Sequence, residues 1–295
     1  MGNLIAAVSP VFLTRRADGV IVKGIDEVPT GSSSGRPVLF IGNHQLYGAD
    51  LAIIIKEFID SKKELVRGLA HPILFMDNPE TANPRGGMGD PSIRELFTTF
   101  GAVKVSGSAI FELLQRNESV LLFPGGVKEA YHLKGEQYKL LWPEKTDFVR
   151  MAALFDAIIV PFASVGIADS VNIVLDSNDI LSLPILGERA KEQSSRIPQA
   201  RPGGDDNFIA PISIPKAPSR NYFIFENPID TRELNVYDKE QSKKFYLNVK
   251  QSVEKGISTL LKIRDSDPYR EWLPRVAYET INKKEAPVPA LNRFD

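Results

Sequence analysis

Two short hydrophobic runs in the sequence end abruptly in small and polar residues, and each has the length of a buried β-strand. Val38–Gly42 is followed by Asn43 and His44, and Val120–Phe123 is followed by a Pro-Gly-Gly turn. In α/β proteins the loops at the carboxyl ends of buried strands carry the chemistry. The rest of the chain is therefore interpreted around these two loops.

Other hydrophobic patterns alternate between strand and helix along the chain. Strands are predicted at 19–24, 102–105, 157–165 and 221–225, and helices at 51–63, 92–99, 108–115, 146–155, 176–182 and 237–263. In the last helix Phe245, Val249 and Val253 recur at helical spacing. Alternation of this kind predicts an α/β fold, a single domain with a mainly parallel central sheet flanked by helices.

Composition shifts suggest three parts: an N-terminal segment and linker at 1–35, a main domain at 36–265, and a C-terminal extension at 266–295. The apolar residues 2–13 fit either a helix lying on lipid or a segment packed on the core. Packing is favoured, because the basic residues sit at one end and do not line one face. Gly31–Gly35 matches G-x-S-x-G, but no strand precedes it, so a flexible linker is expected.

Two long segments lack a clear hydrophobic period. Residues 76–90 are rich in Asn, Pro and Gly, which is typical of a lid or binding loop. Residues 187–220 hold many Ser, Pro and Gly and few large apolar side chains, so a mobile loop is predicted.

The bulk composition excludes several classes of function. The net charge is −1, which gives no support to nucleic-acid binding. The sequence has no cysteine, which excludes disulfides, thiol nucleophiles and cysteine-ligated metals. No apolar run reaches the roughly 18 residues of a membrane-spanning helix, and no signal or transit peptide is legible.

Only three histidines are available as a catalytic base, and His44 at the end of the first strand is the strongest candidate. A loop through Gly48 can fold Asp50 back onto the imidazole, where a carboxylate would fix the tautomer. The alternative is structural, with Asp50 capping the next helix. His71 either lines the pocket or makes a structural hydrogen bond, and His132 is expected to support the site or face solvent.

The second loop offers backbone amides and charged groups. The glycine pair Gly125 and Gly126 lets amides approach an oxyanion closely, although Pro-Gly-Gly alone also fits an ordinary turn. Lys128 and Glu129 follow, and they are expected either to contact substrate or to pair with each other or with Arg67.

These residues also resemble a known superfamily. Asn-His-(five residues)-Asp followed by Phe-Pro-Gly-Gly-Val-Lys-Glu is similar to the superfamily of glycerol-phosphate and diacylglycerol acyltransferases. The match tightens over 66–72, 100–107, 135–144, 148–152 and 267–270. Together these stretches resemble the acyltransferase half of plant phytyl ester synthases over residues 8–280. The superfamily usually has four residues between histidine and acid, and this chain has five.

The resemblance implies a fold like that of glycerol-phosphate acyltransferases, with His44 as base and Asp50 as its partner. It implies substrate binding by Gly125, Gly126, Lys128, Glu129, Arg67 and His71. Relatives that bind an acceptor phosphate have Glu, Thr and Arg where this chain has Gly125, Val127 and Lys128, so an uncharged alcohol such as diacylglycerol or phytol is expected.

The resemblance further implies acyl-CoA or acyl-carrier protein as co-substrate, with no other cofactor and no metal. It implies a plastid location and association with a membrane or lipid-droplet surface. The plant enzymes carry a transit peptide and a hydrolase-like half ahead of this region, so a short family member or an excised domain is expected. An acyl thioesterase or esterase, or a non-catalytic lipid-binding module, are the alternatives.

Overall fold

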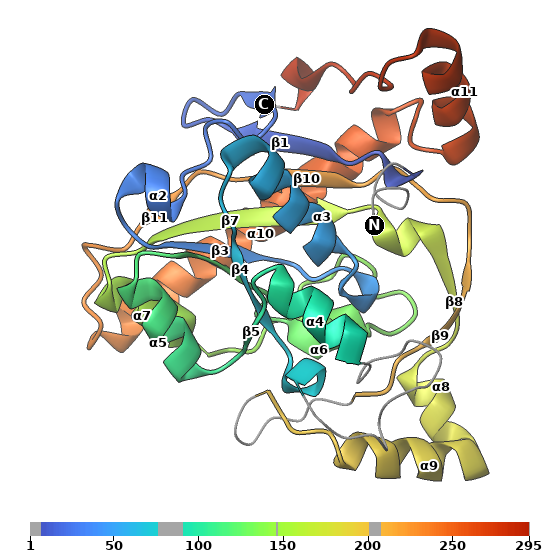
Figure 1. Cartoon of the computed structure of the whole chain (residues 1–295), viewed down its shortest axis with the longest axis horizontal. Helices are drawn as coiled ribbons and strands as arrows, with labels where there is room; N and C mark the ends of the chain where they lie inside the picture. Colours follow the sequence, from blue (N-terminus) through green and yellow to red (C-terminus); the bar gives the residue numbers. More distant parts are fainter. Residues whose placement is uncertain (1–6, 76–90, 146, 201–207, 295) are drawn as a thin grey trace.

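The computed structural model describes residues 7–75, 91–145, 147–200 and 208–294, and a mixed sheet lies at its centre (Figure 1). In these residues the sheet has nine strands in the order β2-β1-β10-β7-β3-β6-β4-β5, with β11 pairing beside β7. The strands are β1 (Val11–Arg15), β2 (Ile21–Lys23), β3 (Val38–Gly42), β4 (Arg67–Ala70), β5 (Val103–Lys104), β6 (Ser119–Leu122), β7 (Ile158–Val165), β10 (Tyr222–Phe225) and β11 (Ile229–Asp230).

The middle of the sheet is parallel. Strand β3 pairs in parallel with β7 on one side and β6 on the other, and β4 and β5 continue beyond β6. Strand β10 runs antiparallel to β7, and β1 pairs with β10 in parallel. The predicted α/β fold with a mainly parallel sheet is therefore confirmed, and the loops after β3 and β6 meet at one edge.

Both faces of the sheet are covered. Successive side chains of its central strands point to opposite faces, and each face has its own hydrophobic core. Along β3, Leu39 and Ile41 belong to one core, and Val38 and Phe40 belong to the other. The first core lies under helices α5 (Gly107–Gln115), α7 (Asp147–Leu154) and α10 (Lys239–Ser266). Helix α3 (Asp50–Glu57) and the π-helical turn Phe58–Lys62 cover the other face (Figure 1).

The N-terminal segment is part of this sheet. All residues of β1 are buried, so the packed alternative is confirmed for the described residues. Because β1 and β2 belong to the central sheet, residue 35 does not separate two structural units. The predicted linker is wrong: Gly31–Ser34 forms a short helix, α2, which Thr30 caps with its side chain. This helix lies before β3, at the opposite end of the strand from His44, so its serines are not placed as nucleophiles.

The predicted mobile loop at 187–220 is also wrong over much of its length. It overlaps helix α9 (Pro184–Ser195) and contains strand β9 (Ile212–Pro215), which pairs with β8 (Val171–Leu175). Helix α8 (Ser177–Ser182) precedes α9. Composition misled here because α9 packs through small residues: a Cβ at Gly187 would lie 2.5 Å from the carbonyl oxygen of Leu181.

The remaining elements are α4 (Pro91–Thr99), α6 (Gly126–Ala130) and α11 (Trp272–Asn282), with short helical turns at Leu46–Gly48, Pro72–Phe75, Ile167–Ser170 and Leu291–Arg293. The expected loop at 76–90 falls outside the described residues. In the described part of the chain, no helix combines the length and apolar composition needed to cross a bilayer.

Candidate active site

His44 and Asp50 lie together at the carboxyl edge of the sheet, just after β3. His44 Nδ1 lies 3.2 Å from Asp50 Oδ1, and the other oxygen of the buried Asp50 accepts from the Gln45 amide at 3.1 Å. The turn that brings them together uses left-handed backbone at Tyr47 and Gly48. A Cβ at Gly48 would lie 3.1 Å from His44 Cε1, so glycine permits both the turn and the close approach of the ring. The predicted fold-back of Asp50 onto His44 is confirmed as geometry.

The imidazole of His44 is held on its face as well as at its edge. It stacks on Phe123 at the end of β6, with ring centroids 4.1 Å apart and planes 12° from parallel. The side chain is 14% exposed, and no hydrogen bond joins Nε2 to any described residue. The Asp50 carboxylate therefore positions Nδ1, and Nε2 is available to bind a ligand.

The loop that carries His44 is tied to β7. Asn43 exchanges two hydrogen bonds with the backbone of Ser164, at 2.9 and 2.8 Å, and Gln45 donates to the Ser164 hydroxyl at 3.1 Å. All three residues are buried. Sequence reasoning missed Asn43 and Gln45, although two amide side chains flanking a candidate base were a usable signal.

Glu129 supports the same loop from helix α6, which follows the neighbouring strand β6. Its carboxylate accepts from the amides of His44 at 2.7 Å and Leu141 at 2.9 Å, and the side chain is buried. Burial raises the pKa of Glu129 to about 7, although the two amide donors favour its ionised form. A Cβ at Gly125 would lie 2.2 Å from Glu129 Cδ, so glycine at this position makes room for the carboxylate.

The backbone amides of Gly125 and Gly126 in the second loop differ in their hydrogen bonding. The Gly126 amide donates to the Phe123 carbonyl at 3.1 Å, within a turn that requires the positive φ of Gly126. The Gly125 amide makes no hydrogen bond to the described residues. Of the two predicted oxyanion donors, only Gly125 is therefore left with a free amide.

A cavity of about 760 Å³ opens beside His44, Gly125 and Gly126. Its described lining is mainly aliphatic and aromatic and includes Leu51, Leu69, Ile73, Leu74, Phe97, Val105, Ile110, Leu122 and Phe148. Lys145 and Asp147 also line it, with opposite charges. His71 belongs to the wall: its ring packs on Phe208 with centroids 4.8 Å apart, and its Nδ1 accepts from the Ile73 amide at 3.2 Å.

Two of the predicted substrate-binding residues are not brought into this site. Arg67 stands at the first position of β4 and pairs with Glu118, with 3.3 Å between Nε and Oε2. The Lys128 side chain is exposed, and neither residue lines a cavity described here. Both oxygens of Glu129 accept from backbone amides, those of His44 and Leu141.

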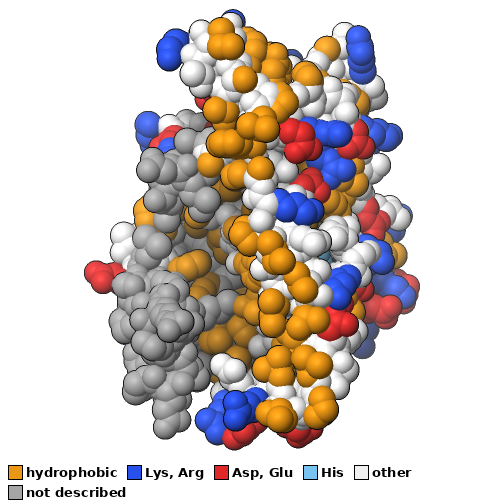
Figure 2. Space-filling view, turned by 90° about the vertical axis from the view of Figure 1, so that its right-hand side faces the viewer, with side chains coloured by type: hydrophobic (Ala, Val, Ile, Leu, Met, Phe, Trp, Pro, Cys, Tyr) orange, Lys and Arg blue, Asp and Glu red, His pale blue; other side chains and the backbone are white. Residues whose placement is uncertain are grey.

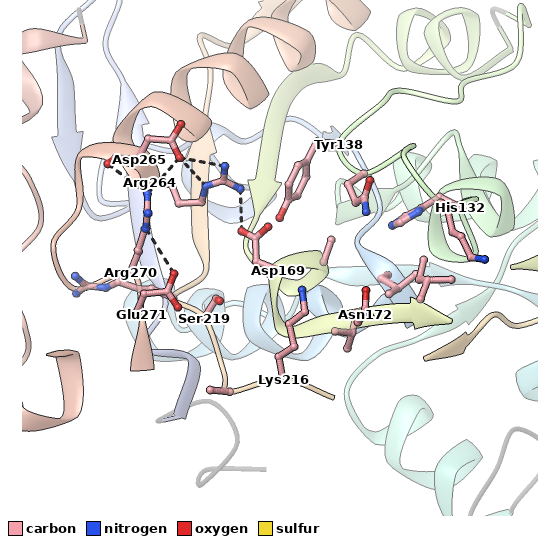
Figure 3. A pocket seen from close by; sticks show the side chains of 18 residues that line it. His132, Tyr138, Asp169, Asn172, Lys216, Ser219, Arg264, Asp265, Arg270 and Glu271 are labelled. Atoms are coloured by element: carbon pink, nitrogen blue, oxygen red, sulfur yellow. Dashed lines mark hydrogen bonds and ion pairs between the residues drawn. The ribbon is translucent and has the colours of Figure 1, made fainter. Parts of the chain in front are cut away.

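A second, polar cavity of about 780 Å³ is lined by Tyr138, Asp169, Lys216 and Arg264, among others (Figure 3). A narrow hollow beside His44 shares Leu46, His132 and Tyr138 with it. Arg264 pairs with Asp169 at 2.8 Å, whereas Lys216 has no ion-pair partner among the described residues.

His132 is buried between these hollows, with its Nδ1 2.9 Å from the Leu133 carbonyl oxygen. Among the described residues there is no group of three or more His, Asp or Glu side chains placed to hold a metal ion.

Comparisons with known proteins agree on one family. Residues 85–184 match the family model described as diacylglycerol acyltransferase. The chain is 42% identical to phytyl ester synthase 1, chloroplastic, and 38% identical to phytyl ester synthase 2, chloroplastic, both from Arabidopsis thaliana. Each match covers 98% of this chain and 41% of the relative, so the chain spans about two fifths of their length.

Among solved structures, the 1-acyl-sn-glycerophosphate acyltransferase PlsC from Thermotoga maritima is similar, with a TM-score of 0.45 and 12% identity. That match covers 88% of this chain and 76% of PlsC, and at this level it carries no argument about the site. The two curated relatives, matched over nearly the whole chain, and the family model are what assign the family. The chain belongs to the phytyl ester synthase and diacylglycerol acyltransferase family.

Proposed function

We propose that the chain is an O-acyltransferase that moves a fatty acyl group from a thioester to the hydroxyl of a neutral lipid alcohol, diacylglycerol or phytol. The observation that carries this proposal is the His44–Asp50 pair with Nε2 open beside an apolar cavity. The names of the relatives and of the family model support the same class of reaction.

In this mechanism His44 Nε2 takes the proton from the acceptor hydroxyl as the oxygen attacks the thioester carbonyl. Asp50, at Nδ1, keeps the proton of the neutral ring on that nitrogen and stabilises the imidazolium. The Gly125 amide donates to the oxyanion of the tetrahedral intermediate. The carbon–sulfur bond then breaks, and the imidazolium returns its proton to the departing thiolate.

The lining of the apolar cavity favours an uncharged acceptor. An acceptor phosphate is best held by an arginine fork, but Arg67 is paired with Glu118 and Lys128 lines no described cavity. The charges of Lys145 and Asp147 offset each other, and most of the remaining wall is hydrocarbon. Such a wall suits an acyl chain and a lipid alcohol.

We assign the polar part of the donor, acyl-CoA or acyl-carrier protein, to the polar cavity lined by Lys216 and Arg264. Both donors carry phosphate, and Lys216 is a cation in that cavity without a described ion-pair partner. Lys216→Ala is expected to raise the KM for acyl-CoA a few-fold with kcat nearly unchanged, since an exposed contact contributes about 1 kcal/mol or less. Lys134, also in the lining, pairs with Asp179, so Lys134→Ala is the matched control. An equal KM in wild type and Lys216→Ala would contradict the assignment.

The reaction calls for no cofactor besides the thioester. We propose a plastid location, which the chloroplastic names of the relatives support. Within the plastid we propose a position at the surface of a membrane or lipid particle, where such acceptors collect.

The test incubates the chain and its His44→Ala variant with labelled acyl-CoA and diacylglycerol, phytol or glycerol 3-phosphate in detergent micelles. Neutral ester is expected from the wild type, and His44→Ala should form it at least about 10²–10⁴-fold more slowly. Equal activity of the two proteins would overturn the mechanism.

The same assay separates the alternatives. Label in glycerol 3-phosphate products would show that the acceptor is charged. Free fatty acid in place of ester would indicate a thioesterase, with water as the nucleophile. Lipid bound without turnover in either protein would indicate a binding module.

A further inference from the structure

Strands β8 and β9, helix α9 and the residue before α9 expose several large aliphatic side chains. Figure 2 views this side of the molecule, where hydrophobic side chains form a band beside a hollow. Six of these side chains are exposed: Ile185 by 74%, Ile214 by 58%, Ile212 by 47%, Leu186 by 43%, Val174 by 41% and Leu183 by 39%. We name these six residues the apolar rim.

Two members of the apolar rim lie on β9, and the alternation along that strand turns them away from the body of the protein. Ser213 faces inward, where its hydroxyl lies 2.7 Å from the hydroxyl of Tyr47. Neighbouring strand residues point to opposite sides, so Ile212 and Ile214 face outward. Their exposure is therefore set by the strand register.

The segment that carries the apolar rim contacts the wall of the apolar cavity. Tyr47 lines that cavity, and its hydroxyl donates to the Pro211 carbonyl at 2.9 Å. Phe208 also lines the cavity, and its amide donates to the Ser194 hydroxyl of α9 at 3.0 Å. The segment that exposes the aliphatic side chains thus also borders the space assigned to the acyl chain and acceptor.

The charges beside the apolar rim are balanced. The described residues from Asp176 to Lys216 carry four acidic and four basic side chains: Asp176, Asp179, Glu188 and Glu192 against Arg189, Lys191, Arg196 and Lys216. Lys191 pairs with Glu188, and Arg196 pairs with Glu192. A surface with no basic excess is attracted only weakly to anionic lipid. Its binding to an uncharged or zwitterionic lipid surface carries no electrostatic penalty.

We propose that the apolar rim docks the protein on an electrically neutral lipid surface, so that lipid alcohols enter the apolar cavity from that surface. The proposal rests on the proposed function for the identity of the substrate. Docking itself requires only the exposed aliphatic side chains, so it can be tested without turnover.

The experiment measures flotation of the full chain with phosphatidylcholine vesicles, with and without added diacylglycerol. The double variant Ile185→Ser/Ile214→Ser is expected to bind at least about tenfold more weakly, since each side chain loses most of its apolar area. The matched control is Leu154→Ser/Leu247→Ser, two aliphatic residues on α7 and α10 that are exposed by 56% and 43%. The control should bind like the wild type.

Several results would overturn the proposal: no vesicle binding by the wild type, equal loss in both double variants, or binding that requires anionic lipid and disappears in high salt. A second double variant, Val174→Ser/Leu186→Ser, tests the same surface if the first double variant fails to fold. It should weaken vesicle binding in the same way. Turnover of a short-chain acyl-CoA and a short-chain alcohol, which need no surface, should be unchanged in every variant. Lost vesicle binding with this turnover intact separates failure of docking from failure of the proposed function.

Discussion

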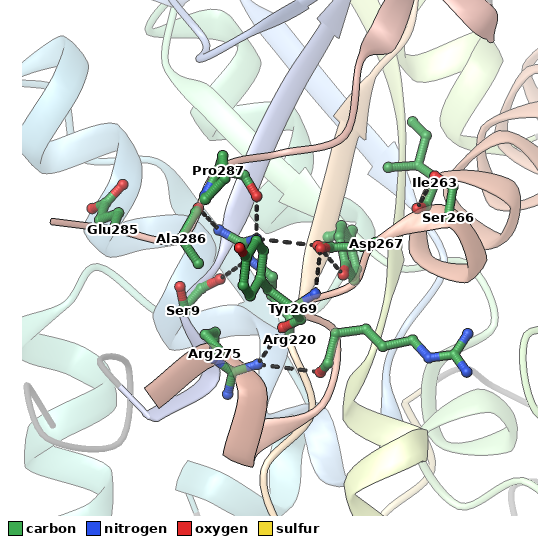
Figure 4. Close-up of polar contacts among 12 residues, drawn as sticks. Ser9, Arg220, Ile263, Ser266, Asp267, Tyr269, Arg275, Glu285, Ala286 and Pro287 are labelled. Atoms are coloured by element: carbon green, nitrogen blue, oxygen red, sulfur yellow. Dashed lines mark hydrogen bonds and ion pairs between the residues drawn. The ribbon is translucent and has the colours of Figure 1, made fainter. Parts of the chain in front are cut away.

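Two of the buried clusters of charged and polar residues in the described part of the chain differ in one respect: the first leaves a side-chain nitrogen open toward a cavity, and the second does not. His44, Asp50 and Glu129 form the site cluster at the carboxyl edge of the sheet. Arg220, Tyr222, Asp267 and Arg275 form the C-terminal cluster, which ties the last segments to the rest of the protein (Figure 4).

The C-terminal cluster is saturated. Arg220 donates to Asp267 at 3.1 Å and to the carbonyls of Ala286 and Pro287 at 2.7 and 3.0 Å. Asp267 also accepts from the Tyr222 hydroxyl at 2.7 Å. In the site cluster, by contrast, His44 Nε2 has no described partner. Burial of charge therefore marks a structural requirement in both clusters, whereas the one group left open indicates where chemistry can occur.

The largest effect that would sharpen this comparison is expected from Asp267→Ala. Removing the carboxylate leaves Arg220 buried without its counter-ion, which should cost about 3–5 kcal/mol of unfolding free energy. The specific activity of the folded fraction should stay unchanged. Urea unfolding measures the first quantity and the ester assay the second.

Asp265→Ala is the matched control, because Asp265 is an exposed acid that pairs with Arg264 and Arg270. Its loss should cost less than about 1 kcal/mol. A folded, stable Asp267→Ala protein without activity would break the division between the two clusters.

The sequence predicted the central strands and the His44–Asp50 pair because the signals are local. A continuous apolar run of strand length ends in a loop whose glycine allows a turn, and all of this lies within 38–50. The hydrogen bond between Glu129 and the His44 amide joins residues 85 positions apart, and that between Arg220 and Asp267 joins residues 47 positions apart. No local sequence pattern predicts such contacts. Helix α9 was mistaken for a mobile loop because its large apolar residues face outward and its packing uses glycine and serine.

The next prediction concerns Glu129. Both of its carboxylate oxygens accept hydrogen bonds, as those of Asp267 do in the C-terminal cluster. Because burial raises its pKa to about 7, the folded state holds the proton more tightly than the unfolded chain does. Its stabilising contribution is therefore complete below about pH 4.5 and is lost as the pH rises through about 7, by roughly 3 kcal/mol. In Glu129→Gln this side chain cannot titrate.

Subtracting the Glu129→Gln stability curve from that of the wild type isolates the contribution of this one carboxyl. The difference should fall between pH 4.5 and 7 and stay level above that range. A constant offset arises because one amide donor then meets an NH₂ group. A flat difference curve would mean that Glu129 is ionised throughout, as its two amide donors favour.

The smallest effect, and the sharpest for the comparison, is expected from Asp50→Asn. The amide can still accept from the Gln45 backbone with its oxygen, but it then presents NH₂ to His44 Nδ1. Nδ1 must accept that bond, so the ring proton moves to Nε2 and the base is blocked. We expect kcat to fall about 10–100-fold, with vesicle binding and unfolding free energy nearly unchanged, whereas Asp60→Asn, an exposed acid on the following turn, should leave all three unchanged. If Asp50→Asn loses stability and keeps its activity, Asp50 belongs with Asp267 as a structural carboxylate, and the open nitrogen of His44 alone distinguishes the two clusters.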